Sequence, residues 1–143
     1  MLSITKKAGY GMVAMTHLAT LSDDRVSSAR EIAELFGVPV SLLMNVLKEL
    51  SSAGLVASTR GAKGGYRLAR PAAEVTMADI LTALEGPIRL ADCVEGNDDK
   101  ACKLVDGCPI VDPVHRVNRR ISDILTQVTL EEMADPAGAP SGE

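Results

Sequence analysis

The sequence is poor in aromatic residues. It has no tryptophan, one phenylalanine and two tyrosines among 143 residues, although 46% of its residues are hydrophobic. A core must therefore be built from aliphatic side chains, which suits a helical protein. The length predicts about one domain, with an arm appended to it.

Long apolar runs are also missing. No stretch approaches the roughly 20 apolar residues that a membrane-spanning helix needs. The apolar run Met12–Leu21 follows two lysines, as in a signal peptide, but Thr16 and His17 interrupt it and an acidic pair follows in place of a small-residue cleavage pattern. We therefore expect a first helix at residues 4–21 and a cytoplasmic protein.

Net positive charge is absent from the second half of the chain. Residues 1–70 carry nine Lys or Arg and five Asp or Glu, a net charge of +4. Residues 71–143 carry six and fourteen, a net charge of −8. This asymmetry predicts that only the first half meets a polyanion such as a nucleic acid.

The first half shows clear helix boundaries. Ser28 and Glu31 have the spacing of a capping box that opens a short second helix, Ala29–Phe36, and Gly37 closes it. Pro39 suits the entry to a third helix, and Gly54 suits its end. Ser41 is expected at the cap or in the first turn of this helix. Apolar residues recur at helical spacing along it and predict one inward face: Leu42, Leu43, Val46, Leu47 and Leu50.

Two short alternating segments follow, Leu55–Thr59 and Tyr66–Ala69. The turn between them, Arg60–Gly65, is basic and rich in glycine. A β-hairpin with a basic tip is therefore predicted, and Pro71 ends it. Three helices followed by a hairpin are typical of a winged helix-turn-helix, so the fold class is mainly α with a small β-hairpin wing. Residues 1–70 are predicted to form a DNA-binding domain of this kind.

Residues 71–134 are predicted to hold a cysteine loop and a dimerisation helix. A fourth helix, Met77–Leu84 with Thr76 as its cap, leads into the loop at about 88–111. The tail at 135–143 is rich in Pro, Gly and Ala and is expected to be disordered.

The long helix after the loop is predicted to begin with Asp112 as N-cap and Pro113 as first helical residue, and to run to about Val128. Its apolar residues step by three and four, which is the pattern of a seam between two paired helices. They are Val114, Val117, Ile121, Ile124 and Val128.

Polar residues of the third helix and the wing are the candidates for DNA contact. Asn45 can pair bidentately with adenine, whereas Lys48 is better placed for a phosphate. Gly61 lets the backbone approach DNA closely. Winged domains of this pattern also occur as protein-binding modules, and that alternative stays open here. The candidate set is Lys6, Ser41, Asn45, Lys48, Arg60, Gly61, Lys63 and Tyr66.

Cysteine occurs three times, at Cys93, Cys102 and Cys108, all in the acidic loop. An odd number cannot all pair within the chain. In a cytosolic protein such a cluster is more typical of metal binding or redox sensing than of structural disulfides. Zinc usually takes tighter Cys pairs, which the eight- and five-residue gaps do not provide. A structural zinc and a thiol switch nevertheless remain alternatives, the second with two cysteines pairing and one spare.

An iron–sulfur cluster normally takes four protein ligands, most often thiolates. The three cysteines would leave one position for another group. His115 is the nearest histidine and the first candidate, while Asp106 and Asp112 are weaker ones and a water or small molecule is a further alternative. The surrounding carboxylates disfavour unliganded thiolates, and a bound iron centre would offset that negative charge.

The wing and the cysteine loop resemble the Rrf2-type (IscR/NsrR-like) winged-helix transcriptional regulators, nearest to those of the SUF iron–sulfur assembly system. The wing motif is Leu50-x-x-Ala53-Gly54-Leu-Val56-x-Ser58-x-Arg60-Gly61-x-Lys63-Gly-Gly-Tyr66-x-Leu68-Ala69. The first helix and the stretch from Ala78 to Ile88 before the cysteines are also similar.

This resemblance implies a homodimeric transcription factor and no enzyme. Each subunit would place a winged domain on half of a pseudo-palindromic double-stranded DNA operator, and the regulator is expected to be a repressor. The cysteines would bind a 2Fe-2S or 4Fe-4S cluster whose state changes DNA affinity. Four positions depart from family patterns. Met44 replaces a recognition-helix glutamate, Gly9 and Val13 stand where some relatives have a ligand, and Val111 stands where some have a histidine.

Overall fold

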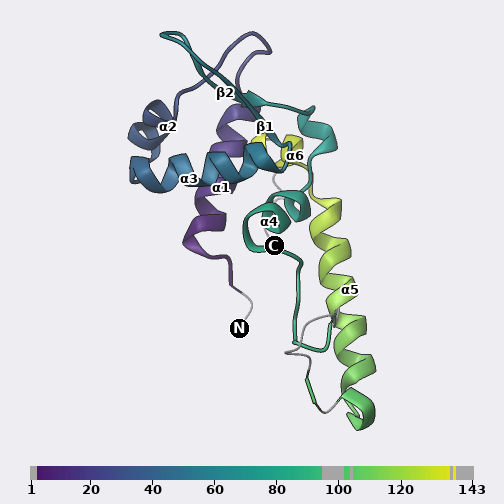
Figure 1. The fold of residues 1–143 in the computed structure, drawn as a ribbon. Coiled ribbons are helices and arrows are strands. Elements are labelled where there is room, and N and C mark those ends of the chain that lie inside the picture. The colour runs from purple at the N-terminus through teal and green to yellow at the C-terminus, as the bar shows by residue number, and fades with distance from the viewer. Residues whose placement is uncertain (1–2, 95–101, 104, 136, 138–143) are drawn as a thin grey trace.

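A computed structural model gives the fold of residues 3–94, 102–103, 105–135 and 137. Helices dominate these residues, and two antiparallel strands form a hairpin. The mainly α fold class with a β-hairpin is confirmed. In chain order the elements are α1 (Lys6–Ala19), α2 (Ala29–Phe36), α3 (Val40–Ser52), β1 (Val56–Thr59), β2 (Gly65–Leu68), the 3-10 turn η1 (Ala72–Glu74), α4 (Met77–Glu85), the 3-10 turn η2 (Val105–Gly107), α5 (Val111–Gln127) and α6 (Leu130–Ala134) (Figure 1).

The predicted helix caps of α2 and α4 are present. Ser28 Oγ accepts from the backbone N–H of Glu31, and the Glu31 carboxylate accepts from the N–H of Ser28. Gly37 ends α2 in the left-handed region at a φ of 67°. Thr76 caps α4 in the same reciprocal way with Asp79.

The predicted start of α5 is wrong, because the helix begins slightly earlier in the chain than predicted. The helix begins at Val111 with Ile110 as its N-cap, so Asp112 and Pro113 lie inside the first turn. The chain already winds before Asp112, because the N–H of Val111 approaches the carbonyl of Cys108 and Val114 donates to Ile110. Proline is tolerated there because N–H groups of a first turn have no partner within the helix.

Helix α6 was missed by the sequence analysis. Thr129 accepts from the N–H of Glu132, and the Glu132 carboxylate accepts from the N–H of Thr129. This capping-box spacing is the sequence signal that could have located α6. Backbone hydrogen bonds from Met77 to Val128 and from Leu130 to Val75 then join the start of α6 to the start of α4.

The core is aliphatic and continuous from the first half of the chain into the second. Helices α1, α2 and α3 supply most of it, and Ile80, Leu84 and Leu130 add side chains from α4 and α6. Leu42 does not belong to it, because its side chain is 46% exposed on α3. The fully buried large residues are Met15, Ile32, Leu43, Leu47, Leu50, Ile80, Leu130, Val46 and Val75.

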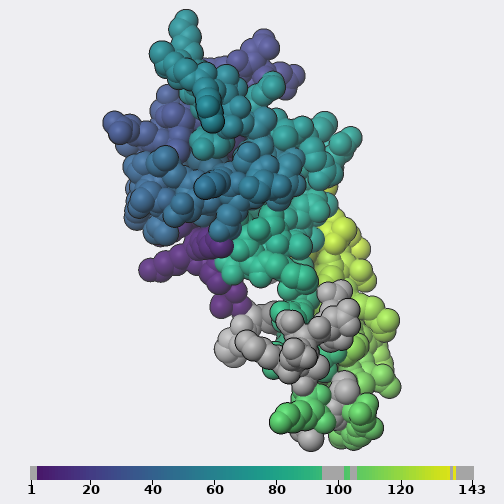
Figure 2. All heavy atoms as spheres, in the orientation of Figure 1, coloured from purple at the N-terminus to yellow at the C-terminus, as the bar shows by residue number. Residues whose placement is uncertain are grey.

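Helix α5 projects from this body. Its last turns lie beside α4 and α6, and its first turns extend away from the wing (Figure 1). In the space-filling view the wing and α3 form the upper part of the molecule and the first half of α5 forms the lower end (Figure 2). No described helix is long and apolar enough to cross a membrane. Apart from Asp135 and Ala137, the predicted disordered tail lies outside the described residues.

Candidate functional site

The outer face of α3 carries polar and apolar side chains together. Ser41, Asn45 and Lys48 are all exposed, as the sequence predicted. Pro39 occupies the N-cap position, so Ser41 lies in the first turn. Met44, next to Asn45 in the chain, is 52% exposed, so the accessible face of the helix also carries an apolar side chain.

A groove of about 400 Å³ lies between α3 and the wing. It brings Asn45 and Lys48 of α3 together with Tyr66 of β2. Ser58, which pairs with Tyr66 across the hairpin, also lines it and was not among the predicted residues. Its place opposite Tyr66 in the strand alternation could have identified it. The remaining lining residues are Met44, Ser51 and Ser52.

The wing rests on the segment that precedes α2. Ser27 and Tyr66 exchange two backbone hydrogen bonds, with N···O distances of 3.0 and 2.8 Å. Arg60, Gly61 and Lys63 are exposed at the tip, and Gly61 has a φ of 117° that favours glycine. The hairpin therefore presents its basic tip at a fixed place relative to α3.

The start of α1 lies beside the second half of α3. Lys7 Nζ is 2.8 Å from a carboxylate oxygen of Glu49, and both side chains are partly exposed. Lys6 is exposed at the first residue of α1, next to this pair. It lies outside the groove that holds Asn45 and Tyr66.

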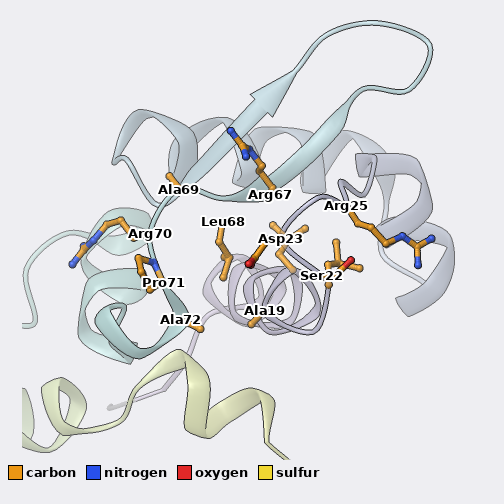
Figure 3. A pocket seen from close by; sticks show the side chains of 12 residues that line it. Ala19, Ser22, Asp23, Arg25, Arg67, Leu68, Ala69, Arg70, Pro71 and Ala72 are labelled. Atoms are coloured by element: carbon orange, nitrogen blue, oxygen red, sulfur yellow. The ribbon is translucent and has the colours of Figure 1, made fainter.

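Three other basic residues of the first half surround a different hollow. It has a volume of about 510 Å³ and lies between the loop after α1 and the end of β2 (Figure 3). Arg25, Arg67, Arg70 and Asp23 line it. Because Arg67 follows Tyr66 on β2, the two side chains point to opposite faces of the hairpin. The positive charge of residues 1–70 is thus divided between two faces, which the charge count alone did not show.

The three cysteines are free thiols, and each is partly buried. Among the residues that the structure describes, no three His, Cys, Asp or Glu side chains gather closely enough to hold a metal ion. The stretches 95–101 and 104, which join Cys93, Cys102 and Cys108, lie outside those residues. The structure therefore does not bring the predicted ligands together as a closed set.

His115 does lie against one of the cysteines. Its Nε2 is 2.9 Å from the carbonyl oxygen of Cys93. A carbonyl only accepts, so Nε2 carries a hydrogen, and in the neutral ring Nδ1 is then the nitrogen with a free lone pair. One turn further along α5, Asn118 is buried and bonds to the backbone of Ile88 and Leu90.

Comparison with known proteins decides the family. Residues 4–136 match the Rrf2 family, described as iron-dependent transcriptional regulators. The chain belongs to the Rrf2 family. Rrf2 proteins are transcriptional regulators and not enzymes, so the predicted family and the predicted lack of an enzymatic role are confirmed.

Solved structures agree in fold. CymR (YrzC), the global cysteine regulator of B. subtilis, is 31% identical with a TM-score of 0.73, and the match covers 94% of this chain and 97% of that one. The oxidized form of Staphylococcus aureus CymR is 30% identical with a TM-score of 0.72 and the same coverage. T. potens IscR is 30% identical with a TM-score of 0.70, covering 99% of this chain and 94% of that one. The winged-helix fold of Rrf2 regulators is thereby confirmed for this chain.

The donor set of this Rrf2 protein fits an iron–sulfur cluster in its chemistry. Cys93, Cys102 and Cys108 would supply three thiolates, the usual ligands of such clusters, and His115, whose Nε2 lies against the carbonyl of Cys93, would offer its Nδ1 as a fourth donor. A ligating histidine commonly donates its other N–H to a backbone carbonyl, and the bond from His115 Nε2 to Cys93 would serve in this way.

Proposed function

We propose that this protein is a homodimeric repressor that binds a pseudo-palindromic double-stranded DNA operator and senses iron–sulfur, redox or nitric-oxide status through its cysteine loop. The observation that carries the DNA-binding part is the groove shared by Asn45, Lys48 and Tyr66. It joins a helix that can enter the major groove to a basic hairpin that can follow the backbone. Since the partner is DNA, we place the protein in the cytoplasm.

The roles within the DNA surface follow from chemistry and exposure. Asn45 offers the carboxamide that pairs with adenine, and Ser41 offers a hydroxyl one turn earlier on the exposed face of α3. Lys48, together with Arg60 and Lys63 at the wing tip, supplies positive charge for phosphates. Lys6 extends this set at the start of α1, Gly61 permits close backbone approach, and Tyr66 forms one wall of the groove.

The dimer would form along α5. Val117 and Ile124 are 46% and 61% exposed on this helix, one heptad apart. Val114, Ile121 and Val128 are only partly buried on the same seam. An apolar stripe that stays partly exposed on a projecting helix is typical of an interface, and the steps of three and four residues suit helix pairing. The spacing of these apolar residues favours α5 of a second copy of the chain as the partner on this surface.

The cysteine loop lies between α4, which shares the core of the DNA-binding unit, and α5. Cys93, Cys102 and Cys108 would hold a 2Fe-2S or 4Fe-4S cluster, with His115 as the candidate fourth ligand. Such a cluster supplies a site that reacts with oxidants or nitric oxide. Because the loop lies between the DNA-binding unit and α5, the state of the cluster could change how α5 sits relative to that unit. A coupling free energy of about 1–3 kcal/mol would change DNA affinity about 5- to 150-fold.

Anaerobic purification with analysis of iron, sulfide and zinc tests this proposal. We expect iron and acid-labile sulfide in the wild-type chain, and their loss in Cys93→Ser, Cys102→Ser and Cys108→Ser. One zinc per chain without sulfide would replace the cluster by a structural zinc and would favour a protein-interaction module.

A thiol switch is the second candidate function. The similarity to S. aureus CymR in its oxidized form favours it, as does the lack of a closed set of metal ligands among the described residues. It predicts that mild oxidation of the metal-free chain removes two hydrogens per chain by forming one disulfide, with one cysteine still open to alkylation. Intact mass under non-reducing conditions distinguishes it from the cluster.

A further inference from the structure

The segment between α4 and Cys93 is attached to α5 by side chains of that helix. Asn118 Oδ1 accepts from the N–H of Leu90 at 2.7 Å, and Asn118 Nδ2 donates to the carbonyl of Ile88 at 3.1 Å. His115 Nε2 donates to the carbonyl of Cys93 at 2.9 Å. His115 and Asn118 are three residues apart, so they lie on one face of α5.

The burial of Asn118 makes this attachment specific. Asn118 is only 6% exposed, and it is the buried residue of α5. A buried carboxamide is costly unless its oxygen and nitrogen both find partners, and here both find backbone groups. Because the partners are backbone groups 28 and 30 residues away, the contact fixes the path of the chain rather than a pair of side chains.

The residue that follows Cys93 is buried in the same region. A hollow of about 560 Å³ between α4 and α5 is lined by His115, Asn118 and Val94. Val94, which directly follows Cys93, is 7% exposed. Cys93 is therefore held on its two sides, by the hydrogen bonds to residues 88–93 and by the burial of its neighbour.

We infer that His115 and Asn118 are positioning residues that clamp the segment of Cys93 to α5 and so transmit the state of the thiol site to this helix. The inference rests on the proposed sensing function. A change at Cys93 that displaces its backbone must either break the hydrogen bonds of the clamp or move α5 with it. If α5 pairs with a second copy, the second outcome shifts one DNA-binding unit relative to the other.

The clamp itself is tested without any metal. In a full chain that carries Cys102→Ser and Cys108→Ser, the remaining thiol is Cys93, and its alkylation by a maleimide reports how well its segment is held. Asn118→Leu should speed alkylation at least about fivefold, as the loss of buried hydrogen bonds predicts. Asn118→Asp, which keeps the acceptor for Leu90 and loses the donor to Ile88, should lie between. Ser122→Ala, in the same hollow one turn along, is the matched control and should leave the rate unchanged.

If the Asn118 variants do not fold, His115→Ala provides the test of the clamp. Its side chain is only partly buried, so the chain should fold and Cys93 should react faster. An unchanged rate in folded Asn118 and His115 variants, checked by circular dichroism, would overturn the clamp.

The transmission is tested in the three-cysteine chain. The DNA probe is one that the wild-type chain selects from random DNA. The readout is a ratio of two affinities for this probe. One is the affinity of the chain with reduced, metal-free thiols, and the other is the affinity of the cluster-loaded or oxidised chain. Asn118→Asp should bring this ratio at least about fivefold closer to one, while Ser122→Ala should keep it. A clamp variant with faster alkylation and an unchanged ratio would overturn the coupling. A wild-type ratio of one would mean that the state of the thiols does not change DNA affinity, and it would reject the proposed sensing. The clamp would then be judged by the alkylation rates alone.

Discussion

Ser27 and Tyr66 are paired backbone to backbone, each donating its N–H to the carbonyl of the other. Ser27 is buried directly before the cap of α2, and Tyr66 lies on β2 in the groove beside α3. This pairing ties the hairpin to the segment before α2 and holds Tyr66 beside α3. Gly65 makes the close approach possible, because a Cβ there would lie 2.8 Å from the backbone of Ser27.

Gly65→Ala should therefore destabilise the protein. The atoms that a methyl group would meet are backbone atoms, which cannot rotate away, and overpacking of this kind costs about 1–3 kcal/mol. Gly9→Ala is the control, since a Cβ there meets nothing within 4 Å and alanine favours a helix by about 1 kcal/mol. Urea unfolding measures both, and a free energy of unfolding for Gly65→Ala at or above the wild-type value would contradict the packing argument.

Lys63→Ala should weaken DNA binding about equally on all sequences. One lost phosphate contact lowers the slope of log affinity against log salt by about 0.9. Arg67→Ala is the matched control, because it removes one positive charge from the opposite face of the hairpin. Fluorescence anisotropy titrations over a salt series measure the slopes. An equal change in slope for both variants would show that the wing tip is not a specific phosphate contact.

The helix boundaries could be predicted from local capping patterns, whereas the contacts between distant segments could not be predicted from the sequence. The pairs Ser28 and Glu31, and Thr76 with Asp79, act within four residues, so their geometry is written in the sequence. The exposure of Leu42 depends on which neighbours reach α3, and helical spacing alone placed it inside. The role of Asn118 could not be foreseen either, because its partners are backbone groups about 30 residues away.

Ile124→Glu should dissociate the proposed dimer. A carboxylate in the middle of a paired apolar seam would be buried without a partner, which is strongly unfavourable. Leu35→Glu is the control, since Leu35 is 62% exposed on α2, almost the same as the 61% of Ile124, but lies off the seam. Sedimentation equilibrium should give a monomer for Ile124→Glu and a dimer for Leu35→Glu. A dimer in both would place the interface on another surface.

Asn45→Ala should relax the preference for one base pair in each half-site. The carboxamide is exposed on α3 in the groove beside Tyr66, and a bidentate pair with adenine contributes about 1–3 kcal/mol of discrimination. Selection from random DNA, performed with the wild-type and variant chains, measures the preference at each position.

Lys48→Ala is the companion variant, because Lys48 lines the same groove three residues further along α3. As a phosphate contact, it should lower affinity on every sequence and leave the selected motif unchanged. The two variants thus separate base readout from positioning on one helix face. If Asn45→Ala selected the wild-type motif with equal stringency, Asn45 would be removed from base readout and the neighbouring Met44 and Ser41 would be the next residues to substitute.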